Sequence, residues 1–285
     1  MTIREAIAHA AQRLEAAGVP DSRTDAEILL SHITGRDRMS MLLSGATELT
    51  QEQEQRFSSL LLSRAKREPL QYLLGTQYFY GLPFQVDQRV LIPRQETEEL
   101  CEWGLRFLKE YAPACPAVLD LCTGSGAIAV TMKRNHSTAQ VTASDLSQDA
   151  LNLAAQNARA NGVDIRFLQG DLWQPLRDER FDLILSNPPY IPTPDCATLQ
   201  QEVLHEPRMA LDGGADGLDF YRRIASEAAA HLTPGGMIAV ELGIGEAETV
   251  AELFELAGLT DVEIRKDLYG IARMVGARRR SEEHV

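Results

Sequence analysis

Several features that would mark a metalloprotein, a secreted protein or a membrane protein are missing from this sequence. The four cysteines, Cys101, Cys115, Cys122 and Cys196, form no Cys-x-x-Cys pair, and the six histidines show no metal-ligand spacing. No apolar run approaches the length of a membrane span, and the N-terminus lacks the apolar core of a signal peptide. We therefore expect no metal site, no disulfide framework, no membrane association and a cytoplasmic location.

The sequence also has fewer basic than acidic residues. The 28 Lys and Arg residues face 41 Asp and Glu residues, which gives a net charge of -13. Such a chain is poorly suited to a polyanionic partner, so no direct nucleic-acid partner is expected. With 285 residues, the chain has room for one large domain and a smaller one.

The first part of the chain, residues 1–75, has helical periodicity and no strand pattern. Apolar residues recur at helical spacing in 3–14, 21–33 and 39–43, and Thr50 with Gln53 begins a longer helix through residue 67. These segments predict a small helical domain, to which we assign substrate docking as a hypothesis. Residues 71–81 are aromatic, glycine-punctuated and strand-like, which predicts a hairpin linker over 76–95.

Strands and helices alternate in the remaining segment, 96–280, which predicts an α/β domain with a doubly wound, mostly parallel sheet. The helices are expected at 126–134, 148–161 and 246–256, and residues 95–99 lead into a further helix through Lys109. The seven strands are expected at 117–121, 140–144, 165–169, 181–186, 237–242, 262–266 and 271–275.

The fourth of these strands ends in an Asn-Pro-Pro-Tyr turn formed by Asn187, Pro188, Pro189 and Tyr190. Neither proline has a backbone N–H, so the turn offers the Asn187 side-chain oxygen and the Pro188 carbonyl as acceptors without competing donors. Two acceptors suit a planar NH2 group, which carries two donors, and Tyr190 could wall one face of it. Held this way, an amide nitrogen would lose part of the delocalisation that makes it a poor nucleophile. The plainer interpretation is a strand terminator.

A glycine-rich loop follows the first strand of this domain. It comprises Asp120, Leu121, Cys122, Thr123, Gly124, Ser125 and Gly126. Its glycines let the backbone approach a ligand and expose helix N-terminal N–H groups, but the loop alone does not distinguish NAD from another nucleoside.

Three side chains after the next two strands complete a predicted nucleoside pocket. Asp145 is placed to accept from ribose hydroxyls, or else to cap a helix together with Ser147. Asp171 is placed to accept from an adenine amino group, and Trp173 offers either a stacking face or a core side chain. The carboxyl ends of adjacent parallel strands meet in one crevice. We expect Asn187 to contact both the cofactor and the acceptor there.

The meeting of a nucleoside pocket and an amide clamp favours S-adenosylmethionine over NAD as the cofactor. A sulfonium methyl donor needs only in-line attack by a held nucleophile, leaving S-adenosylhomocysteine, and alignment of this kind is worth about 7–11 kcal/mol. No covalent nucleophile is needed, so the lack of a Ser-His-Asp or Cys-His arrangement is expected.

The combination of residues 120–129 with Asn-Pro-Pro-Tyr-Ile at 187–191 resembles the HemK/PrmC family, the peptide chain release factor glutamine-N5 methyltransferases. The resemblance runs nearly end to end, through residues 67–75, 90–94, 206–207, 213–218 and 267–270. Asn-Pro-Pro-Tyr alone is also typical of DNA adenine-N6 methyltransferases, the alternative function.

The resemblance implies an S-adenosylmethionine-dependent methyltransferase fold, which is Rossmann-like, with an N-terminal helical domain. It implies methylation of the glutamine in the Gly-Gly-Gln motif of release factors, which would be the protein partners in translation termination. Residues 122–126, Asp145 and Trp173 would bind the cofactor, and 187–190 would hold the glutamine amide. The sequence departs from the family at Cys122, where glycine is usual, and at Gln95, where proline is usual.

Overall fold

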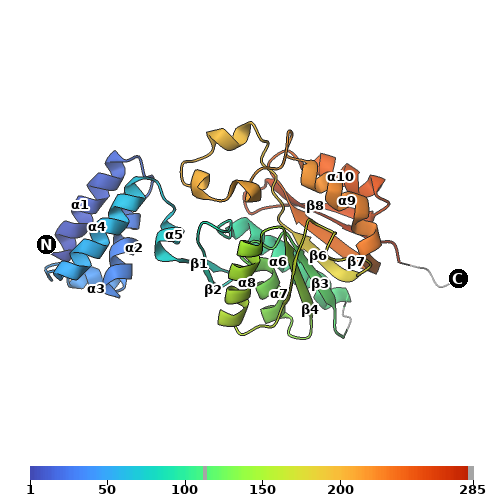
Figure 1. Ribbon diagram of the computed structural model, residues 1–285, viewed down its shortest axis with the longest axis horizontal. Coiled ribbons are helices and arrows are strands. Elements are labelled where there is room, and N and C mark those ends of the chain that lie inside the picture. Colours follow the sequence, from blue (N-terminus) through green and yellow to red (C-terminus); the bar gives the residue numbers. More distant parts are fainter. Residues whose placement is uncertain (112–113, 282–285) are drawn as a thin grey trace. The chain divides into compact units, whose positions relative to one another are not determined.

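The computed structural model describes residues 1–111 and 114–281 (Figure 1). The chain divides into two compact units. One comprises Met1–Thr76 with Gln200–His205, and the other comprises Gln77–Leu199 with Glu206–Val285.

The first unit is a small helical bundle. Its helices are α1 (Ile3–Ala16), α2 (Ser22–Thr34), α3 (Arg38–Leu43), α4 (Gln51–Ala65) and α5 (Leu70–Leu74). Thr2 with Glu5 and Thr50 with Gln53 form capping boxes that satisfy free N–H groups at the starts of α1 and α4. One face of each long helix is buried, which produces the apolar core that the helical spacing predicted.

The predicted strand over 71–81 is wrong in its first part. Residues Leu70–Leu74 form α5, a single helical turn that starts after Pro69 and ends at Gly75, whose φ is +69°. Proline suits the start of a helix and a left-handed glycine suits its end, and these two signals override the aromatic pattern between them.

Buried ion pairs join distant parts of this unit. Arg64 Nε donates to Asp25 Oδ2 at 2.7 Å, and an Arg64 terminal nitrogen lies 2.9 Å from Glu202 Oε1. Arg67 donates to both carboxylate oxygens of Glu202, at 2.6 Å each. The segment Gln200–His205 is therefore tied to α4 and the turn after it by paired guanidinium groups.

The second unit begins with a two-stranded hairpin, β1 (Thr76–Phe79) and β2 (Leu82–Gln85). Phe79 and Phe84 meet edge to face, with their ring centroids 6.0 Å apart. Helix α6 (Gln95–Tyr111) follows and covers the main sheet.

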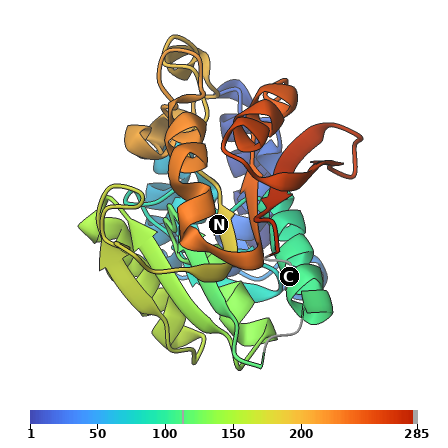
Figure 2. The same ribbon diagram turned by 90° about the vertical axis from the view of Figure 1, so that its right-hand side faces the viewer.

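The main sheet has seven strands in the order β5-β4-β3-β6-β7-β9-β8. The β7–β9 and β8–β9 pairs are antiparallel, and the pairs that join β5, β4, β3, β6 and β7 are parallel. Figure 2 shows the β8–β9 hairpin, in red, projecting from this unit. The strands are β3 (Ala117–Leu121), β4 (Gln140–Asp145), β5 (Arg166–Gln169), β6 (Phe181–Ser186), β7 (Leu232–Glu241), β8 (Thr260–Lys266) and β9 (Ala272–Arg278).

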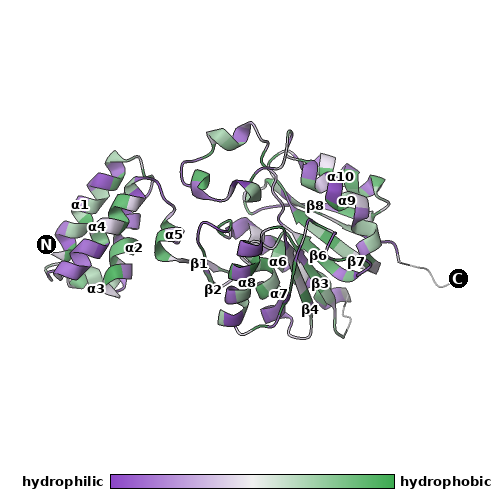
Figure 3. Ribbon diagram, viewed as in Figure 1, coloured by the Kyte–Doolittle hydropathy of each residue, from purple (hydrophilic) through white to green (hydrophobic). Residues whose placement is uncertain are grey.

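Successive residues of the central strands serve two separate cores, because side chains alternate across a sheet. Val118 and Leu183 pack under α6, α7 (Ala127–Asn135) and α8 (Gln148–Ala160). Leu119 and Ile184 pack under α9 (Asp219–His231) and α10 (Ala247–Leu256). With both faces covered, the central strands β3 and β6 are mostly apolar, and Figure 3 shows the hydropathy of each residue along the ribbon.

The doubly wound seven-stranded sheet and the helical N-terminal part confirm the predicted fold class. The bounds of β3 and β6 are as predicted, whereas β7 starts at Leu232, upstream of the Pro234-Gly235-Gly236 segment that obscured it. Helix α9 was not predicted, although Tyr221, Ile224, Ala225 and Ala228 recur there at helical spacing. Within residues 1–111 and 114–281, none of the helices is long and apolar enough to cross a membrane.

Candidate active site

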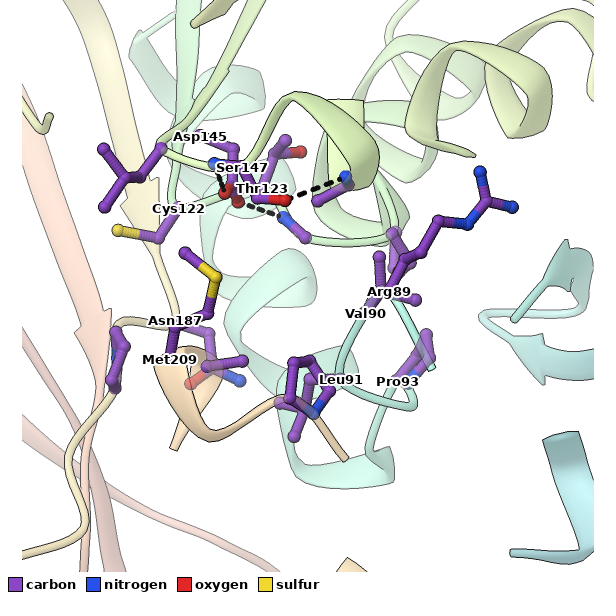
Figure 4. Close-up of a pocket in the computed structure, with 18 of the residues that line it drawn as sticks. Arg89, Val90, Leu91, Pro93, Cys122, Thr123, Asp145, Ser147, Asn187 and Met209 are labelled. Carbon is purple, nitrogen blue, oxygen red and sulfur yellow. Dashed lines mark hydrogen bonds between the residues drawn. The ribbon is translucent and has the colours of Figure 1, made fainter. Parts of the chain in front are cut away.

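The carboxyl ends of three neighbouring strands lie side by side at the edge of a cavity. Leu121 pairs in register with Ser144 of β4 and with Ser186 of β6. The residues that follow these three are Cys122, Asp145 and Asn187. All three line a cavity of about 360 Å³ (Figure 4). This volume lies in the range of small-molecule sites.

The glycine-rich loop forms one wall of the cavity through Thr123, Gly124 and Ser125. Gly124 has a φ of +54° and Gly126 a φ of +82°. A Cβ on Gly126 would lie 3.0 Å from the Ala154 Cβ, so this glycine allows the loop to pass close to α8. The loop thereby brings its backbone to the cavity at the start of α7.

Asp145 joins the loop to the start of α8. Its Oδ2 accepts from the Gly124 N–H at 2.8 Å and its Oδ1 accepts from the Ser147 N–H at 2.9 Å. Burial raises the pKa of Asp145, and these backbone N–H groups oppose the shift. The helix cap is Ser147, whose hydroxyl accepts from the Ala150 N–H, so Asp145 is not itself the cap. Each carboxylate oxygen has a further lone pair with which to accept from a ligand.

Two glycines, Gly213 and Gly217, pack closely against the Asn-Pro-Pro-Tyr turn at Tyr190. A Cβ on Gly213 would lie 2.7 Å from the Tyr190 Cα, and a Cβ on Gly217 would lie 2.5 Å from the Tyr190 carbonyl oxygen. The backbone at 213–217 can approach Tyr190 this closely only without side chains at these positions. The turn that carries Asn187 is thus fixed by close packing as well as by its prolines.

The loop before α6 forms the opposite wall, which the sequence did not assign to the site. Arg89, Val90, Leu91, Pro93 and Arg94 line the cavity. Figure 4 shows Val90, Leu91 and Pro93 across from Cys122 and Asp145.

Buried Glu206 holds this loop in place. One of its carboxylate oxygens accepts from the Ile92 N–H at 3.0 Å, and the other accepts from Arg94. Both segments, 90–94 and 206–207, are among those that resemble the family, which is the one feature of the sequence that could have pointed to this contact. No spacing rule links the two segments.

Cys122 places a side chain in the cavity at a position where glycine is expected from the resemblance. Its φ of +65° is a left-handed conformation that favours glycine, which agrees with the departure from the family at this position. Burial raises the pKa of the Cys122 thiol, and the negative charge of Asp145 raises it further. The thiol is accordingly held neutral and acts as a small apolar group.

Four other predicted site residues support the cavity without lining it. Asp120 Oδ2 accepts from the Thr123 hydroxyl and from the Ala129 N–H, which holds the glycine-rich loop against α7. Gly126 contacts α8, and Pro188 is buried and lies in the chain between the lining residues Asn187 and Pro189. Tyr190, expected to wall the bound group, is partly buried and packs against the core beneath α9 and α10.

The structure does not bring Asp171 and Trp173 to this cavity. Trp173 is buried, stacks on His231 with the ring centroids 4.6 Å apart, and donates to the Arg223 carbonyl at 3.2 Å. Asp171 lies 2.7 Å from Arg223. Leu172 has a φ of +49°, in a turn after β5 that leads Trp173 to the α9 side of the sheet.

Metal-ligand geometry is absent from the part of the chain that the structure describes. No group of three or more His, Cys, Asp or Glu residues there lies close enough together to hold a metal ion.

Comparison with known proteins identifies the family. The PrmC N-terminal domain matches residues 5–75 and the methyltransferase small domain matches residues 104–216. The release factor glutamine methyltransferase of Geobacter sulfurreducens is 47% identical over 278 residues, which cover 97% of this chain and 96% of that protein. The enzyme of that name from Deinococcus radiodurans is 43% identical over 98% of this chain and 99% of its own length. This chain belongs to the release factor glutamine methyltransferase family.

Solved structures agree with this family in fold. A methyltransferase from Pyrococcus furiosus matches with a TM-score of 0.52 at 18% identity, covering 81% of this chain and 100% of its own. A T. thermophilus 16S rRNA N2 methyltransferase, RsmC, in complex with AdoMet and guanosine, also has a TM-score of 0.52, at 19% identity over 72% of this chain and 50% of its own. The resemblance of this chain to the release factor glutamine methyltransferase family is confirmed, and the DNA adenine alternative is not favoured.

Proposed function

We propose that this protein transfers a methyl group from S-adenosylmethionine to the side-chain nitrogen of the glutamine in the Gly-Gly-Gln motif of peptide chain release factors. The observation that carries the proposal is the meeting of the Asn-Pro-Pro-Tyr turn with the glycine-rich loop and Asp145 in one cavity. An amide acceptor and a nucleoside-linked donor would then share a single compartment. The names and near full-length coverage of the relatives support the same acceptor.

The residues around the cavity fit the cofactor. The loop 122–125 offers backbone groups, and Asp145 offers lone pairs on a carboxylate to ribose hydroxyls. When bound, S-adenosylmethionine would supply a methyl group to the amide nitrogen; the C–S electron pair would stay on sulfur, giving S-adenosylhomocysteine, and the methylated nitrogen would lose one proton to solvent. The apolar groups Val90, Leu91 and Ala150 would line the remaining surface and exclude water.

The chain's own contribution is to hold the acceptor. Asn187 Oδ1 and the Pro188 carbonyl would each accept one of the two hydrogens of the glutamine NH2 group. These contacts orient the nitrogen and favour loss of its conjugation with the carbonyl. Alignment of this kind is worth about 7–11 kcal/mol of the barrier. Neither acceptor needs to change its protonation during the reaction.

The test is mass spectrometry of purified release factor after incubation with this protein and S-adenosylmethionine. We expect one added methyl group, mapped by fragmentation to the Gly-Gly-Gln glutamine. A release factor with asparagine in place of that glutamine serves as the matched control and should gain none. Methyl transfer to another residue, or to duplex DNA in a parallel reaction, would contradict the proposal.

A further inference from the structure

The side-chain amide of Asn187 has a hydrogen-bond partner in Thr97, which lines the same cavity. Its Nδ2 donates to Thr97 Oγ1 at 3.1 Å, and the Thr97 hydroxyl donates to Glu241 Oε2 at 2.6 Å. Thr97 is 5% exposed and Glu241 is 3% exposed, so both groups are shielded from water. Three side chains, from α6, from β7 and from the turn after β6, thus form a mostly buried chain of hydrogen bonds that ends at the proposed clamp.

The fold brings these residues together by register. Ser186 of β6 pairs with Val240 of the parallel strand β7, which places Asn187 beside Glu241. The Glu241 carbonyl accepts from the Tyr221 hydroxyl at 2.7 Å, which fixes the end of β7. Thr97 reaches the same point from the first turn of α6.

Each hydrogen bond in this chain has a defined donor and acceptor, and this order determines the orientation of the Asn187 amide. The two ends of an asparagine amide have nearly the same shape, so its partners select the orientation. Thr97 has one hydroxyl proton, which goes to Glu241, and its oxygen is then left as an acceptor. It can accept from the Asn187 NH2 end but would repel the Oδ1 end. The carbonyl oxygen of Asn187 is therefore turned away from Thr97.

We propose that Thr97 and Glu241 are positioning residues that fix Asn187 with its side-chain oxygen presented to the acceptor amide. This inference rests on the function proposed above. If Asn187 were reversed, it would present an NH2 group to the substrate NH2 group, and two sets of donors would face each other. Glu241 thereby acts on the substrate through Thr97 and Asn187, without touching it.

The surroundings of Glu241 agree with this role. Burial raises the pKa of Glu241 to about 7, a shift that hydrogen bonds from Thr97 and Asn187 oppose. Its ionised form accepts only, and this form imposes the direction described above. The groups that face Glu241 are Thr97, Glu96 and Cys101 on α6, Asn187 after β6, Arg273 on β9, Tyr221 on α9 and Tyr190.

The experiment compares steady-state methylation of release factor by four variants of the full chain. Thr97→Val keeps the shape of the side chain and removes the hydroxyl, and Thr97→Ser restores the hydroxyl. Glu241→Gln can donate to the Thr97 oxygen, which frees the Thr97 proton to point at Asn187. Thr131→Val is the matched control, because Thr131 is fully buried and its hydroxyl has no hydrogen-bond partner among the described residues.

We expect Thr97→Val and Glu241→Gln to lower kcat by up to about 100-fold, as loss of alignment does. S-adenosylhomocysteine affinity, measured by calorimetry, should stay within about twofold of wild type, since neither change removes the loop or Asp145. Thr97→Ser should recover most of kcat, and Thr131→Val should match wild type.

Two results would overturn the inference. One is a kcat for Thr97→Val within about twofold of wild type. The other is an equal loss of kcat and cofactor affinity in Thr97→Val that Thr97→Ser does not repair, which would indicate a structural role alone. A wild-type protein that transfers no methyl group to release factor would instead refute the proposed function, so the two failures are distinguishable.

Discussion

The glycine at position 217 provides a sharp test of how the Asn-Pro-Pro-Tyr turn is held. In Gly217→Ala, the new Cβ would lie 2.5 Å from the Tyr190 carbonyl oxygen and 2.7 Å from Glu246 Oε1. The Tyr190 oxygen belongs to the backbone and cannot rotate aside. Either the turn or the 213–217 segment packed against it must therefore shift, which disturbs the support of Asn187.

The cost has two parts that a second variant separates. Gly217 has a φ of +82°, and a left-handed conformation costs an alanine about 1–2 kcal/mol. Overpacking against Tyr190 adds about 1–3 kcal/mol. Gly258→Ala is the matched control, because Gly258 has a φ of +80° and a Cβ there would meet no described atom within 4 Å. Gly258→Ala should lose only the conformational contribution to the unfolding free energy.

The assay is urea unfolding followed by tryptophan fluorescence, together with steady-state methylation. Both tryptophans of the chain, Trp103 and Trp173, belong to the same unit as Gly217, so the signal reports on that unit. We expect Gly217→Ala to lose about 1–3 kcal/mol more unfolding free energy than Gly258→Ala. We also expect it to lower kcat by up to about 100-fold, whereas Gly258→Ala keeps it.

The reasoning would be refuted by equal behaviour of the two variants. If their unfolding free energies agree within about 0.5 kcal/mol and both retain wild-type kcat, Tyr190 has room to move and the close packing does not hold the turn.

Three further predictions concern the cavity itself. Asn187→Ala should lower kcat about 100-fold while S-adenosylhomocysteine still binds in calorimetry, and an equal loss of both would remove Asn187 from the acceptor clamp. Asp145→Ala should weaken that binding about 10- to 100-fold through lost ribose contacts, whereas unchanged affinity would leave Asp145 a purely structural group. Because the ionised form of Glu241 orients Thr97, kcat should fall as pH drops below about 7. Glu241→Gln should abolish that dependence, and an unaltered pH profile in the variant would assign the dependence to another group.

The sequence predicted the parts of the site that follow strands directly. Cys122, Asp145 and Asn187 each come immediately after a predicted strand, and the parallel order places those ends together. Their proximity therefore follows from local patterns and one topological rule. The capping pair Thr50 and Gln53 was predictable for the same reason, since both residues lie within one turn of chain.

The unpredicted parts depend on contacts between residues far apart in the chain. Glu206 supports Ile92 across 114 positions, and Glu241 meets Thr97 across 144. No spacing rule reaches that far, and a glutamate inside an acidic composition gives no local signal. Trp173 illustrates the opposite case: its place after β5 suggested the cavity, but its apolar rings are buried against His231 instead.

The membership of residues 200–205 in the helical unit bears on how this chain can be divided into fragments. The polypeptide passes between the two units three times, after Thr76, after Leu199 and after His205. A fragment cut at residue 76 would keep all five helices but lose Glu202, the carboxylate that both Arg64 and Arg67 contact. Such a fragment would carry a surplus of positive charge at that point, and a synthetic peptide spanning 200–205 would be the natural complement to add back.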